Sequence, residues 1–417
     1  MRVIVLNTGT ELLLGQVLNT HLTFVAREIF SLGLRVERQL TVPDGLPIRE
    51  TLAQVIEEAE IVFVTGGLGP TTDDITREAA ADLLGAELQS NAALIASITE
   101  RLKTRGFPMT DRILRQAEVP RGAIVLPNDN GTAPGLYLRS EQKTAKSAVH
   151  LFLLPGPPRE LEPMFRESVL PILRALVPGR SGIDGRTFRI AGVGESMVEA
   201  AVGSQILALK EIELGYCARA GEVDVRVIGQ AAILDEAERI LRGAFENSIF
   251  TTADENLEDV VVRLLTARKE TVATAESCTG GYVANRLTNV AGASAVFGAG
   301  FVTYANEAKI AALGVEGGLI EKHGAVSAEV CRQMAEGARR KAGATHALAT
   351  TGIAGPTGGS DEKPVGTVYI ALASEAAETT IKRRRFLSDR ETFKRLVSQV
   401  ALEMLRQRLL GSVSVTE

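Results

Sequence analysis

Cysteine is scarce in this chain of 417 residues, and its scarcity argues against two kinds of site. The three cysteines, Cys217, Cys278 and Cys331, are odd in number and include no Cys-x-x-Cys pair. A disulfide framework and a cysteine zinc site are both disfavoured, so a reducing compartment fits the chain best. The four histidines show no pairing pattern either.

Long apolar runs and large basic blocks are also missing. No apolar stretch reaches the roughly 18 residues that cross a membrane, and the chain opens on a strand-like segment, 2–6, without a signal-like apolar core. We therefore expect a soluble cytoplasmic protein with no membrane partner. The formal net charge is −5 and the basic run 382–385 is short, so nucleic acid is disfavoured as a partner and small ligands are favoured.

The remaining composition is that of a globular protein, with 45% hydrophobic and 23% charged residues. At roughly 100–200 residues per domain, the length predicts two to four domains. The pattern of elements predicts an α/β protein of three domains. These are a doubly wound, mostly parallel sheet over 1–178, a small α+β module over 179–250, and a second α/β domain over 251–417.

Alternating apolar and amphipathic segments support this division. In the first domain we expect strands over 2–6, 34–40, 61–64, 123–126 and 150–154, with helices over 19–32, 47–58, from Asp73, and after 155–158. In the middle module we expect a strand over 187–190, a helix over 196–207, two strands joined at 220–221, and a helix over 235–245. In the last domain we expect helices over 257–268, 280–288, 307–313, 328–342 and 390–409, and strands over 271–275, 295–304, 345–350, 366–373 and 379–386.

Five turns of the first domain follow predicted strands and carry residues suited to a ligand. In an open α/β sheet ligands bind at the carboxyl ends of the strands, and glycine-rich turns before helices suit phosphate. The candidate phosphate-binding residues are Gly66, Gly67, Gly69, Thr71, Gly131, Thr132 and Gly156. Candidate ligands for a divalent metal are Asp73, Asp74, Glu11 and Asp44. Each turn alone is equally an ordinary turn, and acidic residues are simply favourable in a first helical turn.

The segment 274–281 is a second candidate site, because it lies where a predicted strand ends and a helix begins. Ser277 or Cys278 is a possible nucleophile, with N–H groups at the helix start for a developing oxyanion. Lys309 is a possible base: if Asn306 caps the next helix, Lys309 lies in its first turn, where the dipole helps to lower its pKa. A surface lysine and a helix-capping serine are the alternative interpretation.

The glycine-rich loop 350–360 is the third candidate, with Lys363 and Arg390 as possible anion contacts. Its glycines remove side-chain bulk, so the loop can approach a phosphate or a flat ring closely. A flexible connector is the alternative. No Gly-x-x-x-x-Gly-Lys-Ser/Thr occurs in the chain, so this is not a nucleoside triphosphate loop.

Several motifs of the last domain together resemble the nicotinamide-nucleotide amidase domain of the CinA family of competence/damage-inducible proteins. They are Ala275-Glu-Ser-Cys-Thr-Gly-Gly281, Phe301-Val-Thr-Tyr-Ala-Asn-Glu-Ala-Lys309, His323-Gly-Ala-Val-Ser327, Thr351-Gly-Ile-Ala-Gly-Pro-Thr-Gly-Gly-Ser360 and Glu362-Lys-Pro-Val-Gly-Thr367. The first domain resembles the molybdopterin-binding-like domain of that family, and the middle module resembles its KH-like domain. The resemblance covers nearly the whole chain.

The resemblance implies two hydrolase activities that recycle NAD breakdown products. One is deamidation of nicotinamide mononucleotide, with Ser277 as nucleophile, Lys309 as base and Tyr304 as an assisting hydroxyl, and with no cofactor. The residues implied to hold its substrate are Thr351, Gly352, Gly355, Gly358 and Arg390. The other is hydrolysis of ADP-ribose in the first domain with Mg²⁺, Mn²⁺ or Co²⁺. A homodimer is also expected.

Other classes of function stay open. The first domain is alternatively a nucleotide or pterin sensor without turnover, and the middle module an RNA binder. The segment Gly192-Val-Gly-Glu-Ser196 lacks the basic flanks of an RNA-binding loop, and the acidic Glu195 repels a nucleic-acid backbone. A structural role in competence or recombination is a further alternative that the residues do not support.

Overall fold

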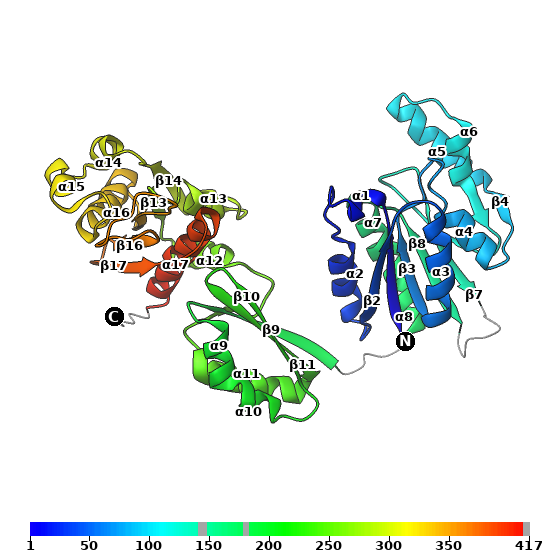
Figure 1. The fold of residues 1–417 in the computed structure, drawn as a ribbon, viewed down its shortest axis with the longest axis horizontal. Coiled ribbons are helices and arrows are strands. Elements are labelled where there is room, and N and C mark those ends of the chain that lie inside the picture. The colour runs from blue at the N-terminus through cyan, green and yellow to red at the C-terminus, as the bar shows by residue number, and fades with distance from the viewer. Residues whose placement is uncertain (141–147, 178–182, 412–417) are drawn as a thin grey trace. The chain divides into compact units, whose positions relative to one another are not determined.

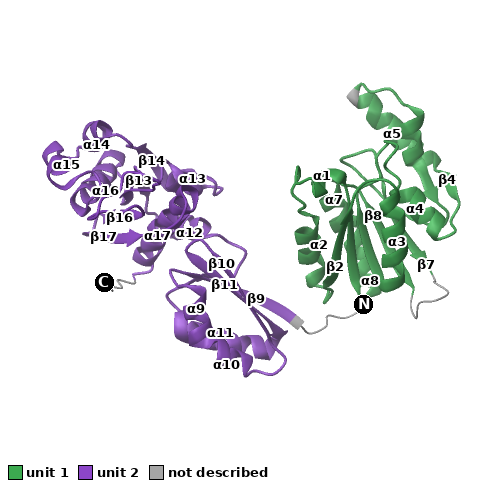
Figure 2. Cartoon of the chain, viewed as in Figure 1, with its two compact units in different colours: residues 1–183 green, residues 184–417 purple. Residues whose placement is uncertain are grey.

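The computed structural model describes residues 1–140, 148–177 and 183–411. These residues form two compact units, 1–183 and 184–417, which Figure 2 colours separately. The second unit contains both the middle module and the carboxyl-terminal domain, and the expected domain limit at Pro178 lies outside the described residues. In the described ranges no helix is long and apolar enough to cross a membrane.

The first unit is built on a six-stranded sheet in the order β2-β1-β3-β8-β7-β6 (Figure 1). The strands β1, β2, β3 and β8 pair in parallel, whereas β7 pairs antiparallel with both of its neighbours, β8 and β6. Their bounds are β1 Val3–Thr8, β2 Val36–Val42, β3 Ile61–Thr65, β6 Ile124–Leu126, β7 Gly135–Ser140 and β8 Val149–Leu154. The predicted mostly parallel sheet is confirmed, but the sequence pattern missed β7.

Helices cover both faces of this sheet, as expected for a doubly wound fold. One core contains residues of α2 (His21–Phe30), α7 (Pro158–Met164) and α8 (Leu170–Leu176), and the other contains residues of α3 (Leu46–Glu58) and α4 (Thr76–Leu83). The smaller elements are α1 Thr10–Leu13, β4 Leu88–Ser90, α5 Ala92–Arg105, α6 Asp111–Leu114, η1 Arg115–Ala117, β5 Glu118–Pro120 and η2 Phe165–Val169. The expectation that a helix starts at Asp73 is wrong, because α4 starts at Thr76.

The middle module is a four-stranded sheet in the order β10-β11-β9-β12, with helices packed on it. Its elements are β9 Ile183–Ala191, α9 Glu195–Val198, η3 Glu199–Gly203, α10 Ser204–Leu207, β10 Glu213–Arg219, β11 Glu222–Gln230, α11 Ala231–Phe245 and β12 Ile249–Thr251. The predicted α+β pattern is confirmed. The sequence pattern missed the strand β12, which pairs with β9.

The carboxyl-terminal domain is a five-stranded sheet in the order β14-β13-β15-β16-β17. The strands β13, β14 and β15 are parallel, and β16 and β17 continue the sheet in antiparallel pairing. The strands are β13 Val272–Glu276, β14 Phe297–Val302, β15 His346–Gly352, β16 Thr367–Ser374 and β17 Ala377–Arg385. The helices are α12 Leu257–Arg268, α13 Tyr282–Thr288, η4 Ala293–Ala295, α14 Asn306–Leu313, α15 Gly317–His323, α16 Ala328–Ala342 and α17 Arg390–Leu409.

Two cores hold this domain together. One contains residues of α12, α13 and α17, and the other contains residues of α14, α15 and α16. On the second side α16 approaches α14 at Gly337, where an added Cβ would lie 2.1 Å from the carbonyl oxygen of Leu313. Gly337 therefore sets the distance between α16 and the helix that carries Lys309.

We predict that Gly337→Ala destabilises the protein by about 1–3 kcal/mol, because the added methyl group meets backbone that cannot rotate away. Gly243→Ala in α11 is the matched control, since nothing lies within 4 Å of its added Cβ. The control should raise stability by about 1 kcal/mol through helix propensity. Urea unfolding of both variants checks the prediction, and equal effects in the two would contradict it.

Candidate functional site

The glycine turns and carboxylates predicted in the first unit line a single cavity of about 410 Å³. The turns after β1, β2, β3 and β8 meet there because the carboxyl ends of parallel strands lie at one edge of the sheet. The loop containing Gly131 joins them because β7 is antiparallel, so that its amino-terminal end lies at the same edge. All eleven candidate residues of this unit line the cavity: Glu11, Asp44, Gly66, Gly67, Gly69, Thr71, Asp73, Asp74, Gly131, Thr132 and Gly156.

Packing alone requires glycine at two of these positions. Gly66 has φ +99° and an added Cβ there would lie 2.5 Å from the Thr8 hydroxyl. Gly67 has φ +66° and its added Cβ would lie 2.1 Å from the hydroxyl of Thr76. The chain after β3 therefore packs closely against both β1 and the start of α4. At Gly66 and Gly67 the backbone faces the cavity with no side chain to cover it.

The carboxylates of this cavity are hard oxygen donors, the type that suits Mg²⁺. Within the described ranges, however, no three acidic, histidine or cysteine side chains converge into a metal cage. Asp44 accepts hydrogen bonds from the backbone N–H and hydroxyl of Thr10, and Asp74 accepts from those of Thr71. The donor set fits a metal ion that one or two carboxylates share with ligand phosphates, as Mg²⁺ is usually held.

Glu160 is a lining residue that the sequence-based list of site residues omitted. It is the third helical residue of α7, and it accepts a hydrogen bond of 2.8 Å from Asn128. An added Cβ on Gly131 would lie 1.9 Å from its carboxylate. The sequence could have identified Glu160 as a site residue, because it ends the fifth of the strand-end turns, residues 155–160.

The loop that carries Ser277 in the second unit is wrapped around a buried carboxylate. Glu276 ends β13 and is only 1% exposed, and its carboxylate accepts hydrogen bonds of 2.8–3.0 Å from the N–H groups of Gly281, Val283 and Ala284. The expectation that the N–H groups at this helix start receive an oxyanion is therefore wrong for these three. Glu276 already occupies them.

Burial separates the two candidate nucleophiles of this loop. Ser277 is partly exposed, whereas Cys278 is 4% exposed, and burial raises the pKa of its thiol to about 12. The thiolate is the reactive form of cysteine, so a thiol of this kind is inert near neutral pH. The geometry favours Ser277. All three cysteines are free.

Lys309 is buried, and burial lowers the pKa of its amino group. The expected cap is wrong: α14 begins at Asn306, Ala305 is the N-cap, and no side chain caps the helix. The ammonium nitrogen donates to the carbonyl oxygens of Thr303, Tyr304 and Ala305 at 2.9, 3.0 and 3.4 Å. Three acceptors match the three N–H bonds of an ammonium, while burial favours the neutral amine.

The carbonyl partners of Lys309 belong to the strand end beside Ser277. The strands β13 and β14 pair in parallel, and the Thr303 N–H donates to the Glu276 carbonyl at 2.9 Å. The Ser277 N–H in turn donates to the Thr350 carbonyl of β15 at 3.0 Å. The ends of three adjacent strands thus bring together Ser277, the Lys309 amino group and the glycine loop after β15. Within the described chain no hydrogen bond joins Ser277 directly to Lys309.

Arg390 connects two other predicted site residues. It donates to the Tyr304 hydroxyl at 2.8 Å and to the Gly355 carbonyl at 3.2 Å. Tyr304 is 61% exposed, so its hydroxyl, which accepts from Arg390, keeps its own proton available for a ligand. Thr351 differs, because it is buried and its hydroxyl donates to the Ala325 carbonyl at 2.8 Å. Its side chain anchors the loop.

The other predicted loop residues, Gly352 and Gly358, follow Thr351 in the same segment. An added Cβ on Gly352 would lie 2.8 Å from the Thr367 carbonyl, so its lack of a side chain serves packing between β15 and β16. Gly358 has φ +91°, a conformation that favours glycine. Lys394 was missed by the sequence analysis: its amino group lies 3.6 Å from the Cβ position of Gly280, one turn after Arg390 on α17.

Comparison with known proteins assigns the chain to a family. Family models match it as "Probable molybdopterin binding domain" over residues 4–175, "Damage-inducible protein CinA KH domain" over 185–250 and "CinA C-terminal domain" over 254–409. A CinA-like protein of Akkermansia muciniphila is 44% identical over 96% of both chains. The chain belongs to the CinA family.

A second curated relative agrees with this assignment. A putative competence-damage inducible protein of Symbiobacterium thermophilum is 43% identical over 97% of both chains. Among solved structures, the competence/damage inducible protein CihA of Agrobacterium tumefaciens is 41% identical, with a TM-score of 0.35, over 37% of this chain and 97% of its own. The three-domain α/β architecture expected from the sequence is that of the CinA family models.

We predict that any deamidation by this domain requires Lys309 in its neutral form. Because burial lowers the pKa of Lys309, the rate should rise with pH through that lowered pKa and then level off. Lys309→Arg should lose activity by at least about 100-fold, since a guanidinium stays charged. Rates of ammonia release measured across pH check this, and near-normal turnover by the arginine variant would exclude Lys309 as the base.

Proposed function

We propose that this CinA family member hydrolyses the carboxamide of nicotinamide mononucleotide, giving nicotinate mononucleotide and ammonia. The single observation that carries the proposal is the contrast within the loop after β13. Ser277 is accessible beside the strand end that holds Lys309, whereas the thiol of Cys278 is buried. The resemblance of the motifs to nicotinamide-nucleotide amidases supplies the substrate.

In this mechanism neutral Lys309 takes the proton of the Ser277 hydroxyl as its oxygen attacks the carboxamide carbon. The resulting oxyanion is stabilised by the backbone N–H groups of Cys278 and Thr279, which Glu276 does not engage. The C–N bond then breaks, and the ammonium of Lys309 gives its proton to the departing nitrogen, which leaves as ammonia. In the second half water attacks the acyl-serine, its proton passes through Lys309 to the Ser277 oxygen, and the carboxylate is released.

The remaining residues place the mononucleotide. Arg390 and Lys394 are cations at the amino-terminal turns of α17, beside Gly355 and Gly280 respectively, and suit the phosphate. The Tyr304 hydroxyl, held by Arg390, assists as a donor to the substrate. The glycine loop after β15 gives the flat pyridine ring a surface free of side chains.

The test of this proposal compares Ser277→Ala with Cys278→Ser. Ser277→Ala should reduce ammonia release from nicotinamide mononucleotide by at least about 10³-fold, because no other hydroxyl replaces the nucleophile. Cys278→Ser should retain activity. Circular dichroism of both variants controls for folding, and an active serine variant with a dead cysteine variant would reverse the assignment.

We further propose that the first unit hydrolyses ADP-ribose to AMP and ribose 5-phosphate with a divalent metal. One cavity brings together glycine-rich turns, whose backbone suits a diphosphate, and carboxylates that suit a metal ion. A bound Mg²⁺, Mn²⁺ or Co²⁺ would neutralise the diphosphate charge. Asp73 suits this role, because it lines the cavity and hydrogen bonding from Thr71 lowers the pKa of its carboxyl, which keeps it ionised. The alternative function is a nucleotide or pterin sensor without turnover.

ADP-ribose hydrolysis should therefore require added metal, stop with a chelator, and fall well beyond about tenfold in Asp73→Asn. Asp82→Asn is the control, since Asp82 forms an exposed ion pair with Arg49 outside the cavity. The amidase rate should be unchanged in both variants. A protein that binds ADP-ribose but never cleaves it with any of the three metals would support the sensor.

A further inference from the structure

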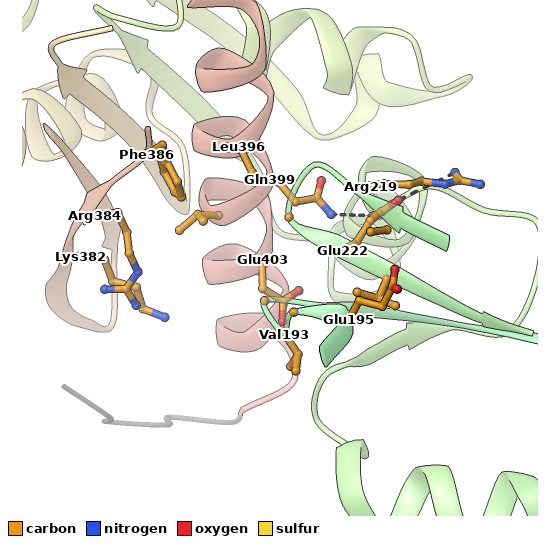
Figure 3. A pocket seen from close by; sticks show the side chains of 16 residues that line it. Val193, Glu195, Arg219, Glu222, Lys382, Arg384, Phe386, Leu396, Gln399 and Glu403 are labelled. Carbon is orange, nitrogen blue, oxygen red and sulfur yellow. Dashed lines mark hydrogen bonds and ion pairs between the residues drawn. The ribbon is translucent and has the colours of Figure 1, made fainter. Parts of the chain in front are cut away.

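A second ligand-sized cavity lies where the middle module meets the carboxyl-terminal domain (Figure 3). Its volume is about 400 Å³, within the range of small-molecule sites. One side is formed by β17 and α17, and the other by the loop 192–195 and the turn between β10 and β11. None of the residues assigned above to the amidase lines it.

One wall of this cavity is cationic. Lys382 and Arg384 are two residues apart on β17, so their side chains share a face of the strand, and Phe386 follows beyond its end. Both line the cavity in Figure 3, on the side of β17. Arg383 lies on the opposite face, where its guanidinium stacks over the Tyr369 ring at 5.9 Å.

Among the described residues no carboxylate forms an ion pair with this wall, although the charge of Glu403 acts on Lys382. In the part of the chain that the structure describes, neither Lys382 nor Arg384 makes an ion pair, and Arg384 donates only to the carbonyl of Arg383. Glu403 also lines the cavity, but it binds Arg406 and Gln407. The amino group of Lys382 is half-buried, and burial together with the charge of Arg384 lowers its pKa.

The rest of the lining is apolar beside this wall and acidic opposite it. Phe386, Leu396 and Val400 provide an apolar surface next to the cations. Across the cavity lie Glu195 and Glu222, the second of which accepts a hydrogen bond from Gln399 at 2.7 Å. A polyanion such as RNA would meet these acids, whereas a small ligand with one anionic end would not.

We propose that this cavity binds an organic phosphate of mononucleotide size. Lys382 and Arg384 hold its phosphate, and its flat ring packs against Phe386, Leu396 and Val400. Arginine and lysine are the side chains that recognise phosphate, and an aromatic surface favours a ring. AMP and nicotinate mononucleotide share this chemistry. The site stands on the cavity itself and does not depend on either proposed hydrolase activity.

The absence of tryptophan from the chain allows a direct test. Phe386→Trp places a single indole in the cavity, so a change in its emission reports on this site rather than on the other two. We expect a saturable change when AMP or nicotinate mononucleotide is titrated into the full-length variant. Inorganic phosphate should bind at least about tenfold more weakly, because it lacks the ring. The tighter of the two mononucleotides identifies the source of the ligand.

Charge reversal supplies the matched control. In the Phe386→Trp background, Lys382→Glu with Arg384→Glu should weaken binding at least about tenfold, since two charge-assisted contacts are lost. Arg383→Glu with Arg385→Glu makes the same change of net charge on the opposite face of β17 and should leave binding within a factor of about two. Equal losses in the two double variants would overturn the proposal, and so would tighter binding of single-stranded RNA than of either mononucleotide.

Calorimetry with the phenylalanine retained covers the case in which the indole itself fills the cavity. The unsubstituted chain should bind one more mononucleotide than the variant with Lys382→Glu and Arg384→Glu. Equal stoichiometry, together with an unresponsive indole, would overturn the proposal. Amidase activity of the variants is an independent measurement, because Lys382 and Arg384 lie outside that machinery.

Discussion

The carboxyl-terminal site depends on the buried carboxylate of Glu276. Three N–H groups at the start of α13 converge on it, and a carboxylate is favoured there by the helix dipole and by charge-assisted hydrogen bonds. The chain between β13 and α13 therefore curls tightly, leaving Ser277 accessible and turning Cys278 inward. The backbone carbonyl of Glu276 also accepts from the Thr303 N–H, so the same residue joins the loop that carries Ser277 to the strand end whose carbonyls hold Lys309.

The long helix α17 explains why the middle module and the carboxyl-terminal domain form one compact unit. Its first turns carry Arg390 and Lys394 beside the loops of the proposed amidase site, whereas its middle turns line the cavity at the middle module. Gln399 accepts a hydrogen bond from Arg286 of α13 at 2.8 Å and donates to Glu222 of β11 at 2.7 Å. One side chain thus ties the helix behind Ser277 to a wall of the second cavity. A movement of the middle module relative to the carboxyl-terminal domain would either break these hydrogen bonds of Gln399 or move α17 as well.

Much of the fold follows from sequence pattern, because hydrophobic periodicity and capping residues act locally. The bounds of α12 and α17 match the expected ones, and the strand-end turns of the first unit converge because parallel strands place them at one edge. Two strands were less predictable. The strand β12 is only three residues long and pairs with the distant β9, and β7 begins at Gly135, in a segment rich in glycine and proline that the sequence pattern assigns to a turn. The pKa of Lys309 was expected to fall, but the cause is burial, which the sequence does not show, rather than a cap at Asn306.

The two units share a local arrangement of strand, turn and helix, but differ in what their backbone N–H groups bind. Each has a buried strand, a glycine-containing turn and a short helix, an arrangement that aims backbone N–H groups at the strand end. In the second unit the Glu276 carboxylate fills that position, and the same turn presents the partly exposed side chain of Ser277. In the first unit α4 starts without a side-chain cap, and the turn at Gly66 and Gly67 faces a cavity. The Asp74 carboxylate accepts from Thr71 in that turn, but no side chain caps α4, which leaves this helix start suited to an external anion. Sequence motifs alone do not distinguish these outcomes, because both turns are rich in glycine and threonine. The two units differ in whether the anion at the helix start is a side chain of the protein or part of a ligand.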